Sequence, residues 1–135
     1  MKTRSELRLI AVQILYQTYV LDSIKTKYLI EDILKDFDEE KDSFAAELIN
    51  GVLKNEKDIT KLANKHLENW TLDRLSLVDK AILSVAIYEL LYTDVPHIVA
   101  INEAVELAKQ FSDEKVIAMI NASLDSILHK EIENE

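Results

Sequence analysis

Apolar residues recur with the spacing of an α-helix along almost the whole chain, and the first segment shows the pattern clearly. Thr3 followed by Glu6 matches a capping box, and an apolar side then begins at Leu7. This pattern predicts a helix over about residues 3–21. Beyond Leu9 the segment is apolar almost all round, which is typical of a helix with neighbours on several sides. Only its first two turns are left free to meet a partner.

The same periodicity predicts further helices over about residues 27–37, 43–67, 77–92, 99–111 and 113–131. Gly51 lies inside one of these helices, where glycine costs about 1 kcal/mol relative to Ala. We expect that another helix packs closely against this position and leaves no room for a side chain. Ser76 and Asp79 open the most apolar segment, which we expect to be the central helix. Ser112 is expected to open the last helix, and the acidic stretch 36–42 to be a solvated loop.

Composition favours one helical domain. A single Gly and a single Pro leave little material for the turns of a sheet protein, and 135 residues with 48% hydrophobic composition are enough to bury a core. No internal repeat divides the chain. We therefore predict an all-α fold, a single-domain bundle of about seven helices over residues 1–135.

The first stretch, Met1 to Asp22, is the only part of the chain with a basic surplus, although the net charge is −9. Lys2, Arg4 and Arg8 face one early acid, and the two arginines lie one helical turn apart on a shared face that we expect to be exposed. Such a local footprint points to nucleic acid binding at one end of the molecule. The alternative is a solubilising helix start, and the charge pattern alone does not decide between them.

The inventory of reactive groups argues against an enzyme. The chain has no Cys and no glycine-rich phosphate loop, and its three His residues are too scattered for a metal motif, so each is expected at the surface or a helix end. We predict no metal and no cofactor. The chain also has neither a leader nor an apolar run near 18 residues, which predicts a cytoplasmic protein without membrane contact.

Trp70, the only tryptophan, lies at a helix junction. A place in the core is the favoured interpretation, and a stacking platform for a base is the alternative.

Four segments resemble the NusB family of bacterial transcription antitermination factors. The most specific is Ala100-Ile-Asn-Glu-Ala-Val-Glu-Leu-Ala-Lys109, and three others keep the order and spacing: 11–16, 73–90 and 120–125. The resemblance covers about residues 4–128. It implies an all-helical fold, binding of boxA-type single-stranded RNA, a heterodimer with the ribosomal protein that doubles as NusE, and a place in the RNA polymerase antitermination complex. A homodimer is also possible.

The resemblance also implies site residues. The arginine-rich start of the family maps onto Arg4 and Arg8, with Lys2 as an ancillary RNA contact, while Ser5 and Glu6 stand where the family usually has more bases. Near the end of the chain Met119 replaces an aromatic residue of the family pattern. The partner surface of the family involves the central helices and their connecting segments, which makes candidates of four residues: Arg74, Asp79, Tyr88 and Glu89.

The sequence therefore favours an RNA-binding adaptor that bridges RNA and a protein partner. One rival is a scaffold of the same fold without RNA binding. A second is the RNA-guiding domain found fused to RNA cytosine methyltransferases, which the absence of a catalytic domain in this chain disfavours. If Lys2, Arg4 and Arg8 all contact phosphates, the log–log salt slope for single-stranded RNA is expected to be about −2.

Overall fold

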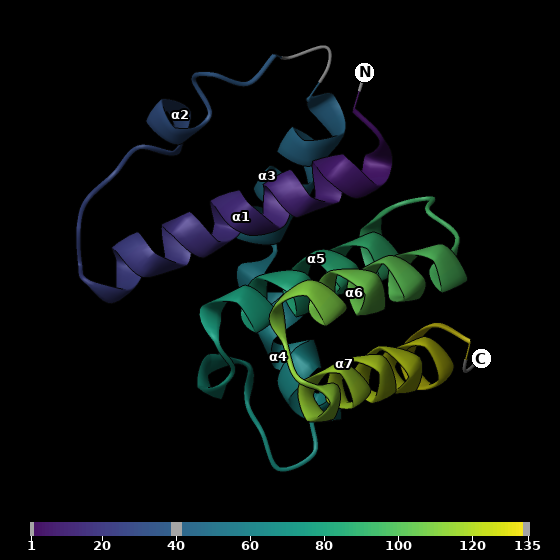
Figure 1. Cartoon of the computed structure of the whole chain (residues 1–135). Helices are drawn as coiled ribbons and strands as arrows, with labels where there is room; N and C mark the ends of the chain where they lie inside the picture. The colour runs from purple at the N-terminus through teal and green to yellow at the C-terminus, as the bar shows by residue number, and fades with distance from the viewer. Residues whose placement is uncertain (1, 39–41, 134–135) are drawn as a thin grey trace.

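The computed structural model describes residues 2–38 and 42–133, and within them the protein is helical without strands (Figure 1). These residues form seven α-helices and one 3₁₀ turn, Leu72–Arg74, and a π-helical turn, Leu128–Ile132, follows the last helix. The helices are α1 (Arg4–Ser23), α2 (Ile30–Ile33), α3 (Ser43–Lys54), α4 (Glu56–His66), α5 (Leu77–Tyr92), α6 (His97–Phe111) and α7 (Glu114–Ile127). The all-α prediction is confirmed.

Helix α5 is the centre of the bundle. It contacts α1, α3, α4, α6 and α7, and every residue from 81 to 90 is buried. Helix α1 crosses α3 and α5 on one side, while α6 and α7 pack in series on the other (Figure 1). An apolar helix with neighbours all round is what the sequence predicts for 77–92, and the bounds agree.

The longest predicted helix, 43–67, is in fact two. Helix α3 ends at Lys54 and α4 begins at Glu56, with Asn55 between them. The Asn55 side-chain amide donates to the Gly51 carbonyl at 2.8 Å and so takes up a carbonyl at the end of α3. The apolar periodicity does not reveal this break, because the apolar sides of both helices pack against α5.

The close approach expected at Gly51 is confirmed. A Cβ atom at this position would overlap the ring of Tyr88 on α5, so the absent side chain lets the two helices meet. Tyr88 is buried against α3 and stacks on Tyr92, with 5.4 Å between the ring centroids.

Two other predicted elements differ in detail. The helix over 27–37 shortens to α2, because its apolar residues are only partly buried and give little packing energy. Helix α7 is capped by Asp113, whose carboxylate accepts from the Val116 amide at 2.9 Å, and not by Ser112. Of the predicted loop 36–42, residues 39–41 lie outside the described residues, Asp36 and Asp38 are exposed, and Asp42 is buried.

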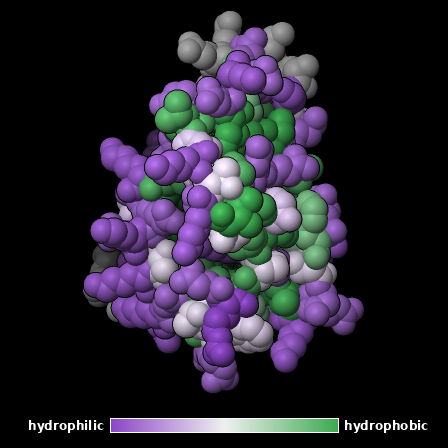
Figure 2. All heavy atoms as spheres, turned by 90° about the vertical axis from the view of Figure 1, so that its left-hand side faces the viewer, coloured by the Kyte–Doolittle hydropathy of each residue, from purple (hydrophilic) through white to green (hydrophobic). Residues whose placement is uncertain are grey.

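Hydrophobic side chains also reach the surface. The face of the molecule on which α1 ends carries hydrophobic patches between hydrophilic side chains (Figure 2), and Ile24 and Leu29, which follow α1, are both more than half exposed. No helix in the described residues is both long and apolar enough to cross a bilayer.

Candidate nucleic-acid interface

The candidate interface is the basic end, which we define as Lys2, Arg4 and Arg8 with the first two turns of α1. A complete capping box starts the helix: the Thr3 hydroxyl accepts from the Glu6 amide at 3.1 Å, and the Glu6 carboxylate accepts from the Thr3 amide at 3.3 Å. The predicted helix start is confirmed. Glu6, the acid that faces the three cations in the sequence, is therefore held by the cap.

Arg8 is buried, so its predicted place on an exposed rim is wrong. Only 2% of the residue is accessible, and its guanidinium makes a two-pronged contact with Glu89 of α5: Nε lies 2.9 and 3.0 Å from the two carboxylate oxygens, and Nη2 lies 2.7 Å from Oε1. Glu103 of α6 lies 3.8 Å from Nη1. The physical reason is the position of α5 beneath this turn, which brings a buried carboxylate that needs a cation.

Glu89 is as deeply buried as its partner, with 1% of the residue accessible. Burial raises the pKa of its carboxyl above the usual range, while the hydrogen bond and positive charge of Arg8 act in the opposite direction. The pair is a structural tie between α1 and α5. Arg8 therefore holds the basic end in place and does not offer its charge to a ligand.

Arg4 is an exposed cation of the basic end. Its guanidinium carbon lies 4.4 Å above the ring centroid of Phe44 on α3, and the Arg8 guanidinium lies 5.2 Å from the same centroid. The ring holds the Arg4 side chain by a cation–π contact without neutralising its charge. Arg4 can therefore meet a phosphate with part of its side chain already oriented.

The Lys2 ammonium group is only partly available to a ligand. Its Nζ lies 2.8 Å from an oxygen of the buried Asp42 carboxylate, although 45% of the lysine side chain is exposed. On the other side of the helix, the Ser5 hydroxyl donates to both oxygens of Glu103, at 2.8 and 3.0 Å. The fold thus gathers four carboxylates, Glu6, Asp42, Glu89 and Glu103, around the three cations. In the folded protein these carboxylates therefore offset the excess of positive charge that the first residues show in the sequence.

The four residues predicted to contact a protein partner differ widely in their exposure to solvent. Arg74, in the 3₁₀ turn, is exposed. Asp79 is buried and accepts hydrogen bonds from the hydroxyls of Ser76, at 2.8 Å, and Ser112. With Tyr88 and Glu89 also buried, three of the four candidates face the protein interior, and the exposure that a contact requires is found only at Arg74.

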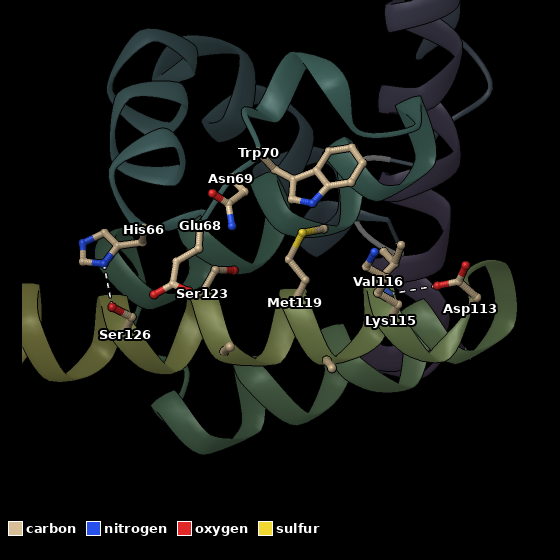
Figure 3. Close-up of a pocket in the computed structure, with 12 residues that line it drawn as sticks. His66, Glu68, Asn69, Trp70, Asp113, Lys115, Val116, Met119, Ser123 and Ser126 are labelled. Carbon is tan, nitrogen blue, oxygen red and sulfur yellow. Dashed lines mark hydrogen bonds between the residues drawn. The ribbon is translucent and has the colours of Figure 1, made fainter.

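A second surface feature was not favoured by the sequence. Trp70 is 41% exposed, so the expected core position is wrong, and it borders a groove of about 780 Å³ between residues 66–70 and α7. We call this the Trp70 groove. In Figure 3 the indole ring lies above Met119 of α7, while Glu68 and Asn69 point toward α7 beside it. An isolated tryptophan at a helix junction gives no local signal that separates exposure from burial.

His66 forms one wall of this groove. Its side chain is buried, with Nδ1 2.8 Å from the Ser126 hydroxyl and Nε2 2.9 Å from the Glu131 carboxylate (Figure 3 shows the Ser126 contact). Lys65 also contacts Glu131, at 2.6 Å. The predicted helix-end position is confirmed, and the imidazole ties α4 to α7 and to the turn Leu128–Ile132. Among the described residues no group of three or more His, Asp or Glu side chains could hold a metal ion.

Comparisons with known proteins agree on one family. The model of the NusB family matches residues 5–129. The transcription antitermination protein NusB of Halalkalibacterium halodurans is 43% identical over 90% of both chains, and that of Bacillus subtilis is 44% identical over 87% of this chain and 88% of its own. The solved structure of T. maritima NusB superposes with a TM-score of 0.83 at 34% identity, over 96% of this chain and 94% of that one. A chain from the crystal structure of a plectonemic RNA supercoil has the same fold, with a TM-score of 0.80 at 23% identity over the whole of both chains.

Proposed function

The chain belongs to the NusB family, and from this premise we propose that it binds boxA-type single-stranded RNA of ribosomal transcripts and pairs with a NusE-like ribosomal protein. The pair works in the cytoplasm as part of the RNA polymerase antitermination complex. The protein bridges two ligands and catalyses no reaction.

One observation carries the RNA part of the proposal: Arg4 is an exposed cation supported on an aromatic ring at the start of α1. Lys2 is the ancillary contact once a phosphate competes with Asp42 for its ammonium group. Arg8 contributes by holding α1 on α5, which keeps Arg4 over Phe44.

Two available cations in place of three lower the expected salt dependence. With roughly −0.7 per phosphate contact the log–log slope becomes about −1.4, so affinity falls about sevenfold between roughly 50 and 200 mM salt. The net charge of −9 adds repulsion. We therefore expect the isolated protein to bind RNA weakly and with little sequence preference, and the basic ribosomal protein to supply the missing phosphate contacts in the complex.

The test is a fluorescence-anisotropy titration of a boxA-type RNA over a salt series, with and without the NusE-like ribosomal protein. Arg4→Gln is expected to weaken RNA binding about fivefold and to reduce the slope by about 0.7. Lys27→Gln removes another exposed cation, in the segment after α1, and serves as the matched control. Arg74→Gln is expected to weaken the protein–protein complex and leave RNA binding by the isolated protein unchanged. Equal RNA affinity of the Arg4 and Lys27 variants would contradict the RNA site.

A second function has a specific observation in its favour. Four carboxylates surround the three cations of the basic end, as expected of a scaffold that binds only protein. This alternative predicts that the NusE-like protein binds with the same affinity in the presence and absence of RNA, and that the isolated protein shows no salt-dependent RNA binding. The same titration distinguishes the two functions. Sedimentation of the free protein tests whether it forms a homodimer.

A further inference from the structure

We propose that the exposed side of α4 is a second contact for the RNA backbone, separate from the basic end. The proposal deepens the RNA half of the proposed function, because it gives a longer transcript a second point of attachment. In Figure 1 α4 lies in the lower part of the molecule and the N-terminus at the upper right, so the two contacts are at different ends. Four lysines, which we call the lysine stripe, make this contact: Lys54, Lys57, Lys61 and Lys65.

The first argument is the geometry of α4. Lys57, Lys61 and Lys65 follow one another at intervals of four residues, so they lie on one side of the helix, about 6 Å apart along its axis. Ile59 and Ala63, on the opposite side, are buried in the bundle. Because the fold buries the apolar side of α4, it turns the lysines outward. All of them are exposed, as is Lys54, the last residue of α3.

The second argument is that most of these charges are available. Within the described residues no carboxylate forms an ion pair with Lys54, Lys57 or Lys61. Lys65 differs, because its Nζ lies 2.6 Å from the Glu131 carboxylate, although 65% of the lysine side chain is exposed. At the basic end, by contrast, two of the three cations are held by carboxylates. A phosphate at the first three lysines of the stripe therefore displaces no ion pair.

The third argument is that the helix separates charges that alternate in the sequence. Glu56 and Asp58 flank Lys57, so the linear sequence is close to neutral here. On the helix Glu56 lies nearly opposite Lys61, and only Asp58 lies at the edge of the stripe. Burial raises the pKa of Tyr19, and the charge of Glu56 adds to the rise, as expected if Glu56 lies toward α1. The stripe thus forms a local excess of positive charge on a protein of net charge −9.

The composition of this surface favours RNA over a protein segment. Every exposed residue of α4 is polar. Protein interfaces bury an apolar centre and are depleted in lysine, whereas contacts with phosphates require only positive charge. The interval of one helical turn is also similar to the distance between neighbouring phosphates of a single strand. An acidic helix could match the charges, but it would find no apolar residue on this side of α4 to pack against.

The stripe is expected to act on RNA that is already bound at the basic end. Three phosphate contacts give weak binding by themselves, at roughly −0.7 each in the log–log salt slope. Once one part of a strand is held at Arg4, binding of another part at α4 is intramolecular, and its effective concentration is high. A short boxA-type RNA should therefore occupy the basic end alone, and a longer RNA should occupy both contacts.

The experiment measures anisotropy of a boxA-type RNA, and of the same RNA extended by oligouridine on both sides, as the full chain is added over a salt series. We expect the extended RNA to bind about tenfold more tightly at low salt, with a slope steeper by up to about 2. The double variant Lys57→Gln/Lys61→Gln should lose most of this gain and bind the short RNA as the wild type does. Glutamine keeps the helix propensity of lysine, so α4 should remain folded.

Two controls test the assignment. Lys27→Gln/Lys35→Gln changes the net charge equally by removing two exposed lysines outside the stripe. Equal losses in the two double variants would reduce the effect to net charge and reject the site. A labelled glutamate–glycine peptide tests the protein alternative. If this peptide binds in a way that depends on Lys57 and Lys61 while the extended RNA does not, the stripe belongs to an acidic protein segment and the proposal is wrong.

A final arm separates this proposal from the proposed function, with oligouridine that lacks the boxA-type element as the probe. Short-RNA binding that depends on Arg4, with no gain from the extensions, rejects the stripe and leaves the proposed function intact. Failure of the wild-type chain to bind the short RNA, together with oligouridine binding that requires Lys57 and Lys61, supports the stripe and rejects the boxA-type site at the basic end.

Discussion

The basic end and the Trp70 groove are opposite cases of how a sequence becomes a surface. At the basic end three cations stand close together in the sequence, and the fold brings carboxylates to them: Arg8 is consumed by Glu89, and Lys2 is shared with Asp42. At the groove the sequence shows only scattered residues, and the fold assembles an exposed ring and an unpaired carboxylate over α7. The difference shows that the availability of a side chain depends on the neighbours that tertiary packing supplies.

The largest expected effect tests whether Arg8 belongs to the core or to the surface. Arg8→Met should lower the free energy of unfolding by about 3–5 kcal/mol, because it leaves the Glu89 carboxylate buried without a partner. Urea denaturation measures this change. The double variant Arg8→Met/Glu89→Leu should recover most of the loss, since it replaces both charges with apolar groups. If Arg8→Met is as stable as the wild type, Arg8 is not required as the partner of Glu89 and its charge is available to a ligand.

The next effect concerns the support beneath Arg4. Phe44→Leu should weaken RNA binding about threefold, because the cation–π contact that orients the guanidinium is lost. Anisotropy at low salt measures it. In the Arg4→Gln background the same substitution should have no further effect on RNA affinity, which a double-mutant cycle would reveal. Additive losses would show that Phe44 acts on RNA independently of Arg4.

A smaller effect, with the opposite sign, is expected from Asp42. Asp42→Asn should raise RNA affinity about twofold, because the Lys2 ammonium loses its ionic partner and becomes available to a phosphate. The salt slope should steepen by up to about 0.7. The gain should vanish when Lys2→Gln is added. A gain that persists in the double variant would place its cause outside the Lys2 contact.

The smallest effect is a pH response that differs between the two regions. Contacts with Lys65 and His66 lower the pKa of Glu131 below 4.5, so this carboxylate favours the folded state above its unfolded pKa and loses that contribution as the pH falls through its folded pKa. The amide hydrogens of the turn Leu128–Ile132 should therefore lose protection in acid, measured as the exchange rate relative to the intrinsic rate at the same pH. Burial raises the pKa of Glu89, so the folded protein takes up that proton first, and this group favours the folded state more as the pH falls.

Hydrogen exchange resolved by residue measures both trends. Glu131→Gln should remove the acid response of residues 128–132 and leave the protection of α1 and α5 unchanged. A uniform loss of protection over the whole chain, between neutral pH and the pH range in which Glu131 is protonated, would contradict this prediction. It would show that residues 128–132 and the helices α1 and α5 do not respond separately to pH.

The periodicity of the sequence was enough to predict the helical class, the central helix over 77–92, the capped start at Thr3 and the close approach at Gly51. These features depend on residues three or four apart, or on a single residue whose missing side chain signals a neighbour. The break at Asn55 and the short α2 were missed. Both depend on how much of an apolar side is buried against other helices, which periodicity does not report.

The candidate sites were predicted less well, for a related reason. Arg4 is exposed as expected, but Arg8, Asp79, Tyr88 and Glu89 proved to be buried and Trp70 proved to be exposed. Residue type and local spacing place a side chain on one side of its own helix and say nothing of what lies opposite.

The sequence by itself determined where helices form, which side of each is apolar, and the family to which the chain belongs. Only the tertiary structure decided which charges remain free. Arg8 meets a carboxylate 81 positions away, and Ser5 meets one 98 positions away. The physical reason is that a charge is neutralised by whatever lies within a few ångströms, and at those distances the chain has folded back on itself.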